Sequence, residues 1–264
     1  MTTTGSEHRH PPGTTAHLAA ATAAAPGGTG GGTGADPGTG ALGALLLADA
    51  RLPTGGHAHS ATLEGAMAAG LTAEQVPAYI RARLRTVAST EAAAAVLALR
   101  RARSPEPDYG PVQAALAART PSPALRDASA GLGRGLARLA RRIAPAHPAV
   151  TALGTAAAAT PGLRTMRPVV LGALAAVFGM APQATARAVL YDDAQTVTAA
   201  ALKLDPGDPL TAVRWVLDSA PDIEEAVRRA AAVRVPADIP ARSAPLIDQW
   251  AGEHAHATRR LFVA

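Results

Sequence analysis

The sequence contains no cysteine and few aromatic side chains, and both absences restrict the kind of protein it encodes. Without cysteine there is no disulfide, no thiolate nucleophile and no thiolate metal ligand, which fits the reduced interior of a cell. Aromatic residues make up only 3% of the chain, so the core must be built from Ala, Val, Leu and Ile. Because Ala is the strongest helix former and aromatic residues favour strands, this composition predicts packed helices.

Lysine is also nearly absent, and the net charge of +5 comes almost wholly from arginine. Two groups of arginines, within residues 81–85 and 134–142, have the charge to contact a phosphate backbone. No aromatic side chains for base stacking accompany them, and no zinc-finger spacing is present. We therefore interpret both groups as solvent-exposed helix faces and expect no nucleic-acid partner.

Long apolar segments are missing as well. Residues 168–186 carry no charge and approach the length of a membrane span. However, Pro182, two glycines and a high alanine content make the stretch only mildly apolar, which favours a buried helix followed by a turn. The N-terminus has no apolar signal-peptide core. We expect a cytoplasmic protein without a membrane segment.

Enzyme motifs are absent in the same way. The sequence has no G-x-S-x-G, no H-E-x-x-H and no Walker motif. The adjacent carboxylates Asp192 and Asp193 fall on a predicted helix, where neighbouring side chains point in different directions. These observations predict a protein that is not an enzyme and holds no tightly bound cofactor.

Two regions with different composition follow one another along the chain. Residues 1–40 are rich in Gly, Thr and Pro and predict a disordered tail, because they bury too little apolar surface to offset their ordering entropy. Residues 41–264 predict an all-α, single-domain bundle of about ten helices, with Pro or Gly at nearly every junction. We expect helices near 41–50, 60–69, 72–103, 111–118, 124–143, 147–159, 167–179, 183–203, 209–219, 222–233 and 243–260. Ser60 is expected to cap the second helix, with Gly70 at its end, and Thr72 with Gln75 to form a capping box that opens the third.

The stretch RLPTGGHAHS (51–60) predicts a turn between two apolar helices. Pro53 suits the second position of a turn, and Gly55 or Gly56 supplies a permissive backbone. His57 and His59 stand two residues apart, and in a turn both imidazoles are able to face one Ni or Zn ion. Two ligands make a weak site, so the alternatives are a polar turn or a turn that faces a partner protein.

Three other places attract attention. Lys203 closes a long helix, where the helix dipole favours any cation or where a compact ammonium is needed. Arg187 and Tyr191 share a helix face, either as an exposed Arg on a half-buried Tyr or as interface anchors. The last helix predicts an apolar stripe that contains Trp250, and the chain then ends in Leu-Phe-Val-Ala (261–264). These final side chains, Phe262 among them, either dock a partner or pack on the protein's own core. The apolar stripe of the last predicted helix comprises Ile247, Trp250, Ala251, His254 and Leu261.

Four stretches resemble the UreF family of urease accessory proteins. They are LLLADARLPTGGHAHSATLEGAMAAGLT, LRDASAGLGRGLARLA, RPVVLGALAAVFGMAPQATARAVLYDDAQTVTAAALKLDPGDP and LIDQWAGEHAHATRRLFVA. The resemblance implies an all-helical, non-enzymatic protein that is commonly dimeric. Such proteins bind UreD (also called UreH) and the GTPase UreG, and regulate the GTPase step in a complex that inserts nickel into apo-urease. The alternative from composition alone is an all-α ligand-binding or regulatory domain without catalytic activity.

The resemblance also implies roles for individual residues. The family's functional Glu and Lys correspond to Glu64 and Lys203, and an Arg-Tyr pair that faces the GTPase corresponds to Arg187 and Tyr191. An arginine that matters for assembly corresponds to Arg260. The sequence departs from the family where His57 and His59 replace aromatic residues, which makes transient nickel contact at this turn an expectation. It departs again at residues 205–208, where Asp-Pro-Gly-Asp replaces Pro-x-Gly-Gln.

Overall fold

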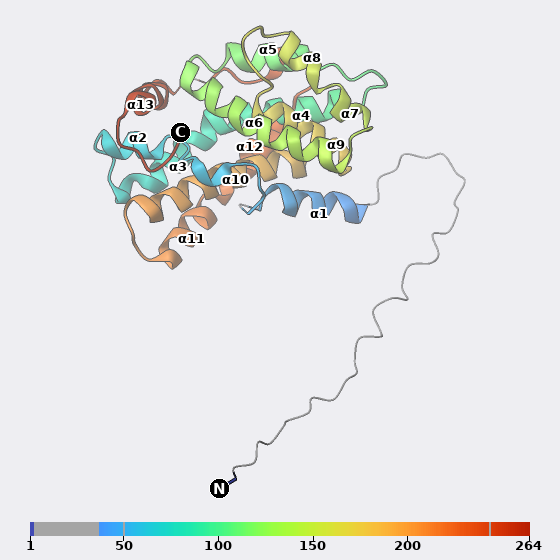
Figure 1. Cartoon of the computed structure of the whole chain (residues 1–264). Helices are drawn as coiled ribbons and strands as arrows, with labels where there is room; N and C mark the ends of the chain where they lie inside the picture. The colour runs from blue at the N-terminus through green and yellow to red at the C-terminus, as the bar shows by residue number, and fades with distance from the viewer. Residues whose placement is uncertain (3–36, 50, 243) are drawn as a thin grey trace. The chain divides into compact units, whose positions relative to one another are not determined.

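A helix with a long, fully buried apolar stretch forms the centre of the helical packing. The computed structural model describes residues 1–2, 37–49, 51–242 and 244–264. Within it, α4 (Val87–Ala102) buries every residue from 92 to 99 (Figure 1). A helix that is apolar all round has to be covered on all sides, because exposing any face would leave apolar surface in water.

Helix α9 (Arg167–Val177) packs directly against α4 through small side chains. A Cβ atom at Gly172 would lie 2.5 Å from Cβ of Ala98 and 2.7 Å from the backbone nitrogen of Leu99. The uncharged stretch 168–186 is thus a buried helix followed by a turn, and the next helix begins at Pro182, as predicted. Among the described residues, no helix has both the length and the apolar character needed to cross a membrane.

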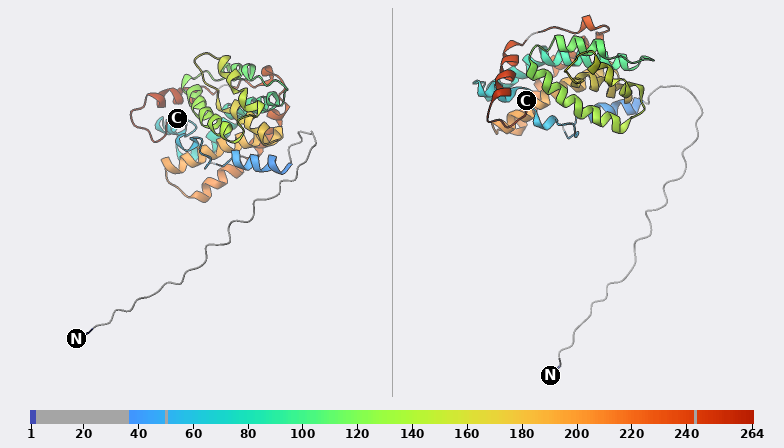
Figure 2. Two further views of the ribbon diagram at one scale, coloured as in Figure 1. Left: turned by 45° about the vertical axis from the view of Figure 1, so that its right-hand side comes forward. Right: turned by 45° about the horizontal axis from the view of Figure 1, so that its top comes forward.

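The remaining helices surround this pair (Figures 1 and 2). Helices α3, α5, α10 and α12 pack on α4, while α6 and α7 pack on α9. At one end of the molecule α2 and α13 lie side by side, next to the C-terminal residues (Figure 2). The other helices are α1 (Pro37–Leu47), α2 (Leu63–Ala68), α3 (Val76–Arg85), α5 (Gly110–Ala118), α6 (Pro123–Ile143), α7 (Pro148–Thr151), α8 (Leu153–Ala158), α10 (Pro182–Leu204), α11 (Pro209–Asp218), α12 (Ala220–Ala232) and α13 (Pro245–His256).

The predicted all-α class is confirmed, since the described part of the chain contains helices and no strand. Every predicted helical segment has a counterpart, but two of them are divided. The segment 72–103 becomes a 3₁₀ turn (Ala73–Gln75), α3 and α4, with a break at Thr86 (φ −125°, ψ −95°). The Thr86 hydroxyl donates to the carbonyl of Ala82 at 2.7 Å, a local bond that competes with helix continuation. The segment 147–159 divides at Ala152 into α7 and α8.

Helix boundaries differ from the prediction most clearly for α1, α2 and α13. Ser60 is not the N-cap of α2, because Ala61 and Thr62 take left-handed φ values of 51° and 66° and the helix begins at Leu63. Helix α1 begins at Pro37, four residues before the expected start, and the rest of the predicted disordered tail, residues 3–36, lies outside the described residues. Helix α13 ends at His256, so Leu261 does not continue its apolar stripe.

The predicted capping box is confirmed. The backbone N–H of Thr72 donates to the side-chain oxygen of Gln75 at 2.9 Å. Gly70 follows α2 with a φ of 102°, a conformation that an L side chain rarely adopts and that commonly ends a helix.

Candidate functional site

The turn at residues 51–60 is a short, fixed segment lying across α6. Gly55 has a φ of 94° and precedes a 3₁₀ turn, Gly56–Ala58, closed by the bond from His59 N–H to the Gly56 carbonyl at 3.0 Å. A Cβ atom at Gly135 of α6 would lie 2.9 Å from the carbonyl carbon of Thr54, so the absence of a side chain there lets the turn approach the helix. The predicted turn is confirmed, with Gly55 as the residue that needs a left-handed backbone.

The C-terminal segment returns to this turn and pairs with it. The backbone N–H of Val263 donates to the carbonyl of Ala58 at 2.7 Å, and the N–H of Ser60 donates to the carbonyl of Ala264 at 2.6 Å. The Ser60 hydroxyl also donates to the Ala264 carbonyl at 3.3 Å. These bonds tie together two segments that are about 200 positions apart in the sequence.

Glu64 holds the same segment from the first turn of α2. Its carboxylate accepts hydrogen bonds from the backbone N–H groups of Leu261 at 2.5 Å and Phe262 at 2.8 Å. The same carboxylate lies 2.8 Å from Nε2 of His254, a buried residue of α13. We call this arrangement the C-terminal clasp: residues 257–264, the turn residues 58–60, and Glu64 with His254.

The electrostatics of the clasp favour an ionised glutamate. Burial alone would raise the pKa of Glu64, but the backbone donors of Leu261 and Phe262, with His254, hold that pKa below its ordinary value. A carboxylate with several directed donors binds them more strongly than a neutral acceptor does. The clasp is therefore a charge-assisted contact.

Phe262 and Lys203 complete the clasp on its inner side. The side chain of Phe262 is buried, whereas Leu261 and Val263 are 63% and 62% exposed. Of the two alternatives for the final side chains, Phe262 follows the second, because its ring packs on the protein's own core, whereas Leu261 and Val263 remain exposed. The ammonium nitrogen of Lys203, at the end of α10, lies 5.3 Å from the centre of that ring, within reach of a cation–π contact.

Two further predicted residues lie beside the clasp. Trp250 of α13 is half-buried, and its ring centre is 6.2 Å from that of Tyr79, so it contributes to packing between α13 and α3. Arg260 is exposed, and its guanidinium donates to the carbonyl of Val263 at 3.3 Å. The hydroxyl of Tyr79 donates to the carbonyl of Ala61 at 2.7 Å and thereby supports the left-handed backbone that precedes α2.

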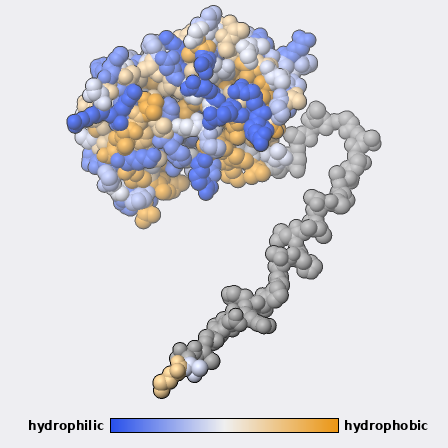
Figure 3. Space-filling view, viewed as in Figure 1, coloured by the Kyte–Doolittle hydropathy of each residue, from blue (hydrophilic) through white to orange (hydrophobic). Residues whose placement is uncertain are grey.

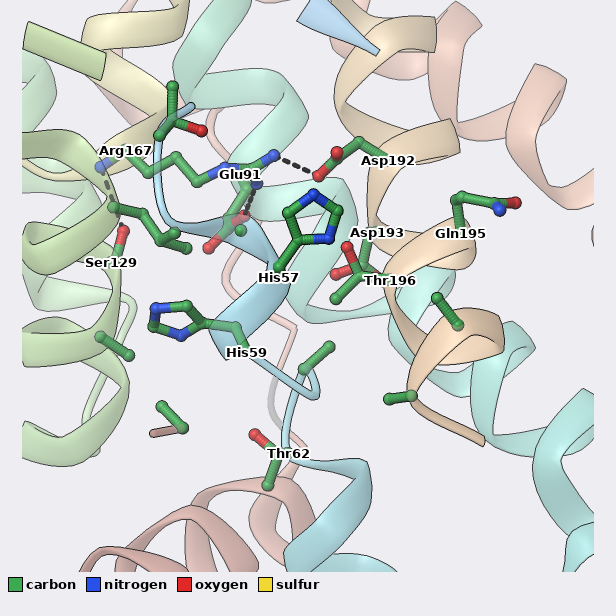
Figure 4. Close-up of a pocket in the computed structure, with 18 of the residues that line it drawn as sticks. His57, His59, Thr62, Glu91, Ser129, Arg167, Asp192, Asp193, Gln195 and Thr196 are labelled. Carbon is green, nitrogen blue, oxygen red and sulfur yellow. Dashed lines mark hydrogen bonds and ion pairs between the residues drawn. The ribbon is translucent and has the colours of Figure 1, made fainter. Parts of the chain in front are cut away.

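A charged cavity of about 150 Å³ lies under the turn and the clasp (Figure 4). Its wall contains three ion pairs, of which the one between Arg83 and Asp193 is buried. Arg83 donates to both carboxylate oxygens of Asp193, at 3.0 and 2.5 Å, and Arg167 pairs with Asp192 and, at 3.5 Å, with Glu91. Phe262 and Lys203 line the same cavity.

This cavity corrects one conclusion from the sequence. Asp192 and Asp193 are neighbours on α10, and we expected them to face different directions; both line the charged cavity, each bound to a different arginine. Burial raises the pKa of Asp192, which the Arg167 guanidinium opposes. Burial likewise raises the pKa of Glu91. The cluster was not recognised from sequence because Asp193 lies 110 positions from Arg83, and Arg167 lies 76 positions from Glu91.

The two histidines of the turn lie on different sides of their segment. Figure 4 shows the ring of His57 near Asp192 and Asp193, while the ring of His59 turns toward α6. Burial, with the nearby charge of Arg167, lowers the pKa of His59 and favours its neutral form. Within the described residues, no group of three or more His, Asp or Glu side chains is placed to hold a metal ion.

A second hollow, a groove of about 470 Å³, lies on the other face of the turn. It is bordered by α6, α13 and the C-terminal segment, and Thr54, His59 and Thr62 border both hollows. Arg134 of α6 and Arg260 of the clasp both line this groove. The turn and the clasp thus separate an inner charged cavity from an outer groove.

Arg187 and Tyr191 form a different surface. They lie one turn apart on an exposed face of α10, and Tyr191 is 38% exposed. The guanidinium of Arg187 is held by Glu224 of α12 through bonds of 2.6 and 2.7 Å. Lys203 follows Tyr191 by about three helical turns on another side of α10, so the predicted site residues fall into two groups.

The departure at residues 205–208 has a local structural role. Asp208 is the N-cap of α11, and its carboxylate accepts from the backbone N–H groups of Leu210 at 3.0 Å and Thr211 at 3.2 Å. These bonds lower the pKa of Asp208. A capping aspartate stabilises the start of a helix, which accounts for an acid at this position.

Comparison with known proteins identifies the family. The model of the UreF family matches residues 71–220. A urease accessory protein UreF of Mycobacterium sp. (strain JLS) is 42% identical over 232 residues, covering 83% of this chain and 97% of the relative. The chain belongs to the UreF family. UreF proteins of Mycolicibacterium vanbaalenii and Mycobacterium marinum are 39% and 35% identical, again covering 83% of the chain and 97% of each relative.

The UreF match covers the Arg187–Tyr191 face and only part of the clasp group. Arg187, Tyr191 and Lys203 lie inside residues 71–220, whereas Glu64 and the C-terminal segment lie outside that match. The alignments with whole UreF proteins extend further and cover most of the chain.

Proposed function

We propose that this UreF protein is a non-enzymatic scaffold and regulator of the GTPase UreG, in a complex of UreD (UreH), UreF and UreG that inserts nickel into apo-urease. Its membership in the UreF family, at up to 42% identity over 83% of the chain, carries this proposal. The relatives are named urease accessory proteins, and this name describes a role that assists urease.

The C-terminal clasp supplies a surface for the first partner, UreD. It fixes the backbone of residues 261–263 and leaves Leu261 and Val263 exposed on either side of the buried Phe262. A segment that is ordered before binding loses little conformational entropy when a partner contacts it. Glu64 and Lys203 act through this segment, Glu64 by binding its amides and Lys203 by covering the Phe262 ring.

The Arg187–Tyr191 face supplies the surface for UreG. Arginine and tyrosine are the side chains most often found as energetic anchors of protein interfaces. Glu224 fixes the guanidinium of Arg187 in one orientation, so the pair presents a preformed surface.

A homodimer is part of the proposal, and α11 supports it. Leu210, Val213 and Leu217 recur at helical spacing and are 57–78% exposed. Exposed apolar stripes of this kind mark protein contact sites. Helix α11 packs on α10, the helix that carries Tyr191.

Nickel enters the proposal as cargo. His57 and His59 carry imidazole nitrogens of the type that binds nickel; both line the charged cavity, and His59 also lines the groove. We assign them transient contact with the ion, without a tightly bound cofactor, in a protein that works in the cytoplasm.

The experiment is stepwise assembly with purified UreD, UreG and apo-urease, followed by size-exclusion chromatography. The wild type is expected to bind UreD and then recruit UreG. Replacing Arg187 and Tyr191 by Ala is expected to abolish UreG recruitment while UreD binding is retained. Arg81→Ala, on an exposed arginine of α3, is the matched control and is expected to behave as the wild type.

Two outcomes contradict the proposal. A wild-type chain that associates with none of these proteins removes the function itself. Retained UreG recruitment by the Arg187/Tyr191 variant moves the GTPase contact elsewhere. For the histidines, replacing His57 and His59 by Ala is expected to lower urease activation in nickel-limited cells, and unchanged activation refutes a need for the imidazoles.

A further inference from the structure

Four arginines of α6 form an exposed stripe that the fold itself does not use. Arg134, Arg138 and Arg141 recur at i, i+4 and i+7, and Arg142 borders them. We call these four residues the arginine stripe. Over α6 the molecular surface is strongly hydrophilic (Figure 3).

The stripe has no acidic partner within the described residues. None of its guanidiniums lies within ion-pair distance of a carboxylate, and none makes a side-chain hydrogen bond. Some exposed arginines elsewhere are paired, as Arg228 and Arg229 of α12 are with Glu225, whereas others, such as Arg81, stand alone and are not grouped in a row. Helix α6 carries a single acid, Asp127, and it precedes the stripe by about two turns.

The arrangement weakens the isolated protein. Like charges at i, i+3 and i+4 repel one another on a helix surface. The helix dipole compensates Arg141 and Arg142 in the last turn of α6, but it does not compensate Arg134 and Arg138. An acidic surface that covers this row of arginines would therefore relieve their mutual repulsion and stabilise the helix.

The stripe is continuous with the surface that the C-terminal clasp presents. Arg134 lines the same groove of about 470 Å³ as Arg260 and Val263 of the clasp. From this groove the stripe runs along α6 over about 12 Å, at a rise of 1.5 Å per residue. A protein that contacts the clasp is thus able to reach the stripe without a second binding site.

We infer that the arginine stripe docks an acidic protein surface, with carboxylates that pair with Arg134, Arg138 and Arg141. The inference rests on the proposed function, since the acidic surface belongs to one of the urease-assembly proteins. Guanidinium forks bind carboxylates in a bidentate manner, and a rigid helix fixes their spacing. The net charge of +5 disfavours a second copy of this chain as the occupant.

A nucleic acid fits the stripe less well. The four arginines cover only the second half of one helix, and α6 includes no aromatic side chain on which a base is able to stack. Phosphate binding without stacking gives a strongly salt-dependent association with no preference for a sequence. Nucleic acid is therefore an outcome of the test.

The test compares two double variants that lose the same charge. Arg138→Gln with Arg141→Gln removes the middle of the stripe, while Arg81→Gln with Arg242→Gln removes two exposed, unpaired arginines elsewhere. Glutamine keeps the helix propensity close to that of arginine, and circular dichroism checks that each variant is folded. Binding is measured by fluorescence anisotropy against labelled poly-L-glutamate and a labelled single-stranded oligonucleotide, and by surface plasmon resonance against UreD, UreG and apo-urease.

The stripe variant is expected to bind poly-L-glutamate and one assembly protein about tenfold more weakly than the wild type at low salt, with the control variant within about twofold. The difference is expected to shrink as salt screens the charges. Equal binding by the two variants overturns the inference, as does an oligonucleotide that binds more tightly than poly-L-glutamate and responds more strongly to the stripe variant. A wild type that binds poly-L-glutamate through the stripe but none of the assembly proteins contradicts the proposed function alone.

Discussion

The contact between α4 and α9 and the C-terminal clasp are built from opposite materials. The helix pair is apolar, and its closeness depends on residues with little or no side chain, above all Gly172. The clasp and the cavity beneath it are polar, and they depend on directed bonds to a few charged groups. The α4–α9 contact has no room for larger side chains, whereas the clasp and its cavity are sensitive to the loss of a charge. The two regions thus depend on different properties of their residues, the helix pair on small volume and the polar region on paired charge.

The largest effect is expected where a buried charge loses its partner. Asp193→Ala leaves the guanidinium of Arg83 buried without a counter-charge and should cost about 3–5 kcal/mol of unfolding free energy. Urea denaturation measures this cost. The control is Asp218→Ala, which breaks an exposed pair with Arg214 and should cost less than about 1 kcal/mol. Equal losses would mean that the polar region is no more sensitive to charge than the surface is.

The apolar region is tested by adding one methyl group. Gly172→Ala places a Cβ atom 2.5 Å from that of Ala98, and the overpacking should cost about 1–3 kcal/mol despite the better helix propensity of alanine. Gly131→Ala in α6, where no atom lies within 4 Å of the added Cβ, should instead stabilise the protein by about 0.5–1 kcal/mol. Opposite signs in urea denaturation are the expected result. A neutral Gly172→Ala variant would show that α4 and α9 separate freely.

The smallest effect concerns the clasp. Glu64→Gln should weaken the hold on residues 261 and 262 by about 1–2 kcal/mol, seen as faster amide hydrogen exchange in the C-terminal segment at neutral pH. The folded pKa of Glu64 lies below its ordinary value of 4.5, so its contribution is complete above that pH and disappears as the pH falls through the folded pKa. The difference between wild type and variant should therefore shrink in acid. A difference that persists in acid would assign the effect to shape instead of charge.

Periodicity and composition predicted most of the fold, because helix formation here follows local rules. Proline at the start of a helix, Gly70 at the end of another and the Thr72–Gln75 capping box all lie where a local pattern placed them. The break at Thr86 was missed because its side-chain bond to Ala82 competes with a pattern that continues as helix on both sides.

The site was predictable only in part, since its geometry is set by segments far apart in the chain. The resemblance to UreF drew attention to Glu64 and Lys203 but gave no contact between them and Phe262. The two alternatives for Phe262 stayed open because nothing near it in the sequence shows that Lys203 and the charged cavity lie beside it. The pairing of Asp192 and Asp193 with different arginines was missed for the same reason: their partners come from α3, α4 and α9.

The bond between Ser60 and Ala264 joins residues about 200 positions apart. Closing so long a loop costs more conformational entropy than forming a local helix contact does. We therefore expect this bond to form late in folding. The apolar helix pair is able to assemble before the last residues arrive, and the cavity beneath the turn stays uncovered until they do. A chain at that stage has its helices packed, but residues 257–264 are not yet bound to the turn and to Glu64.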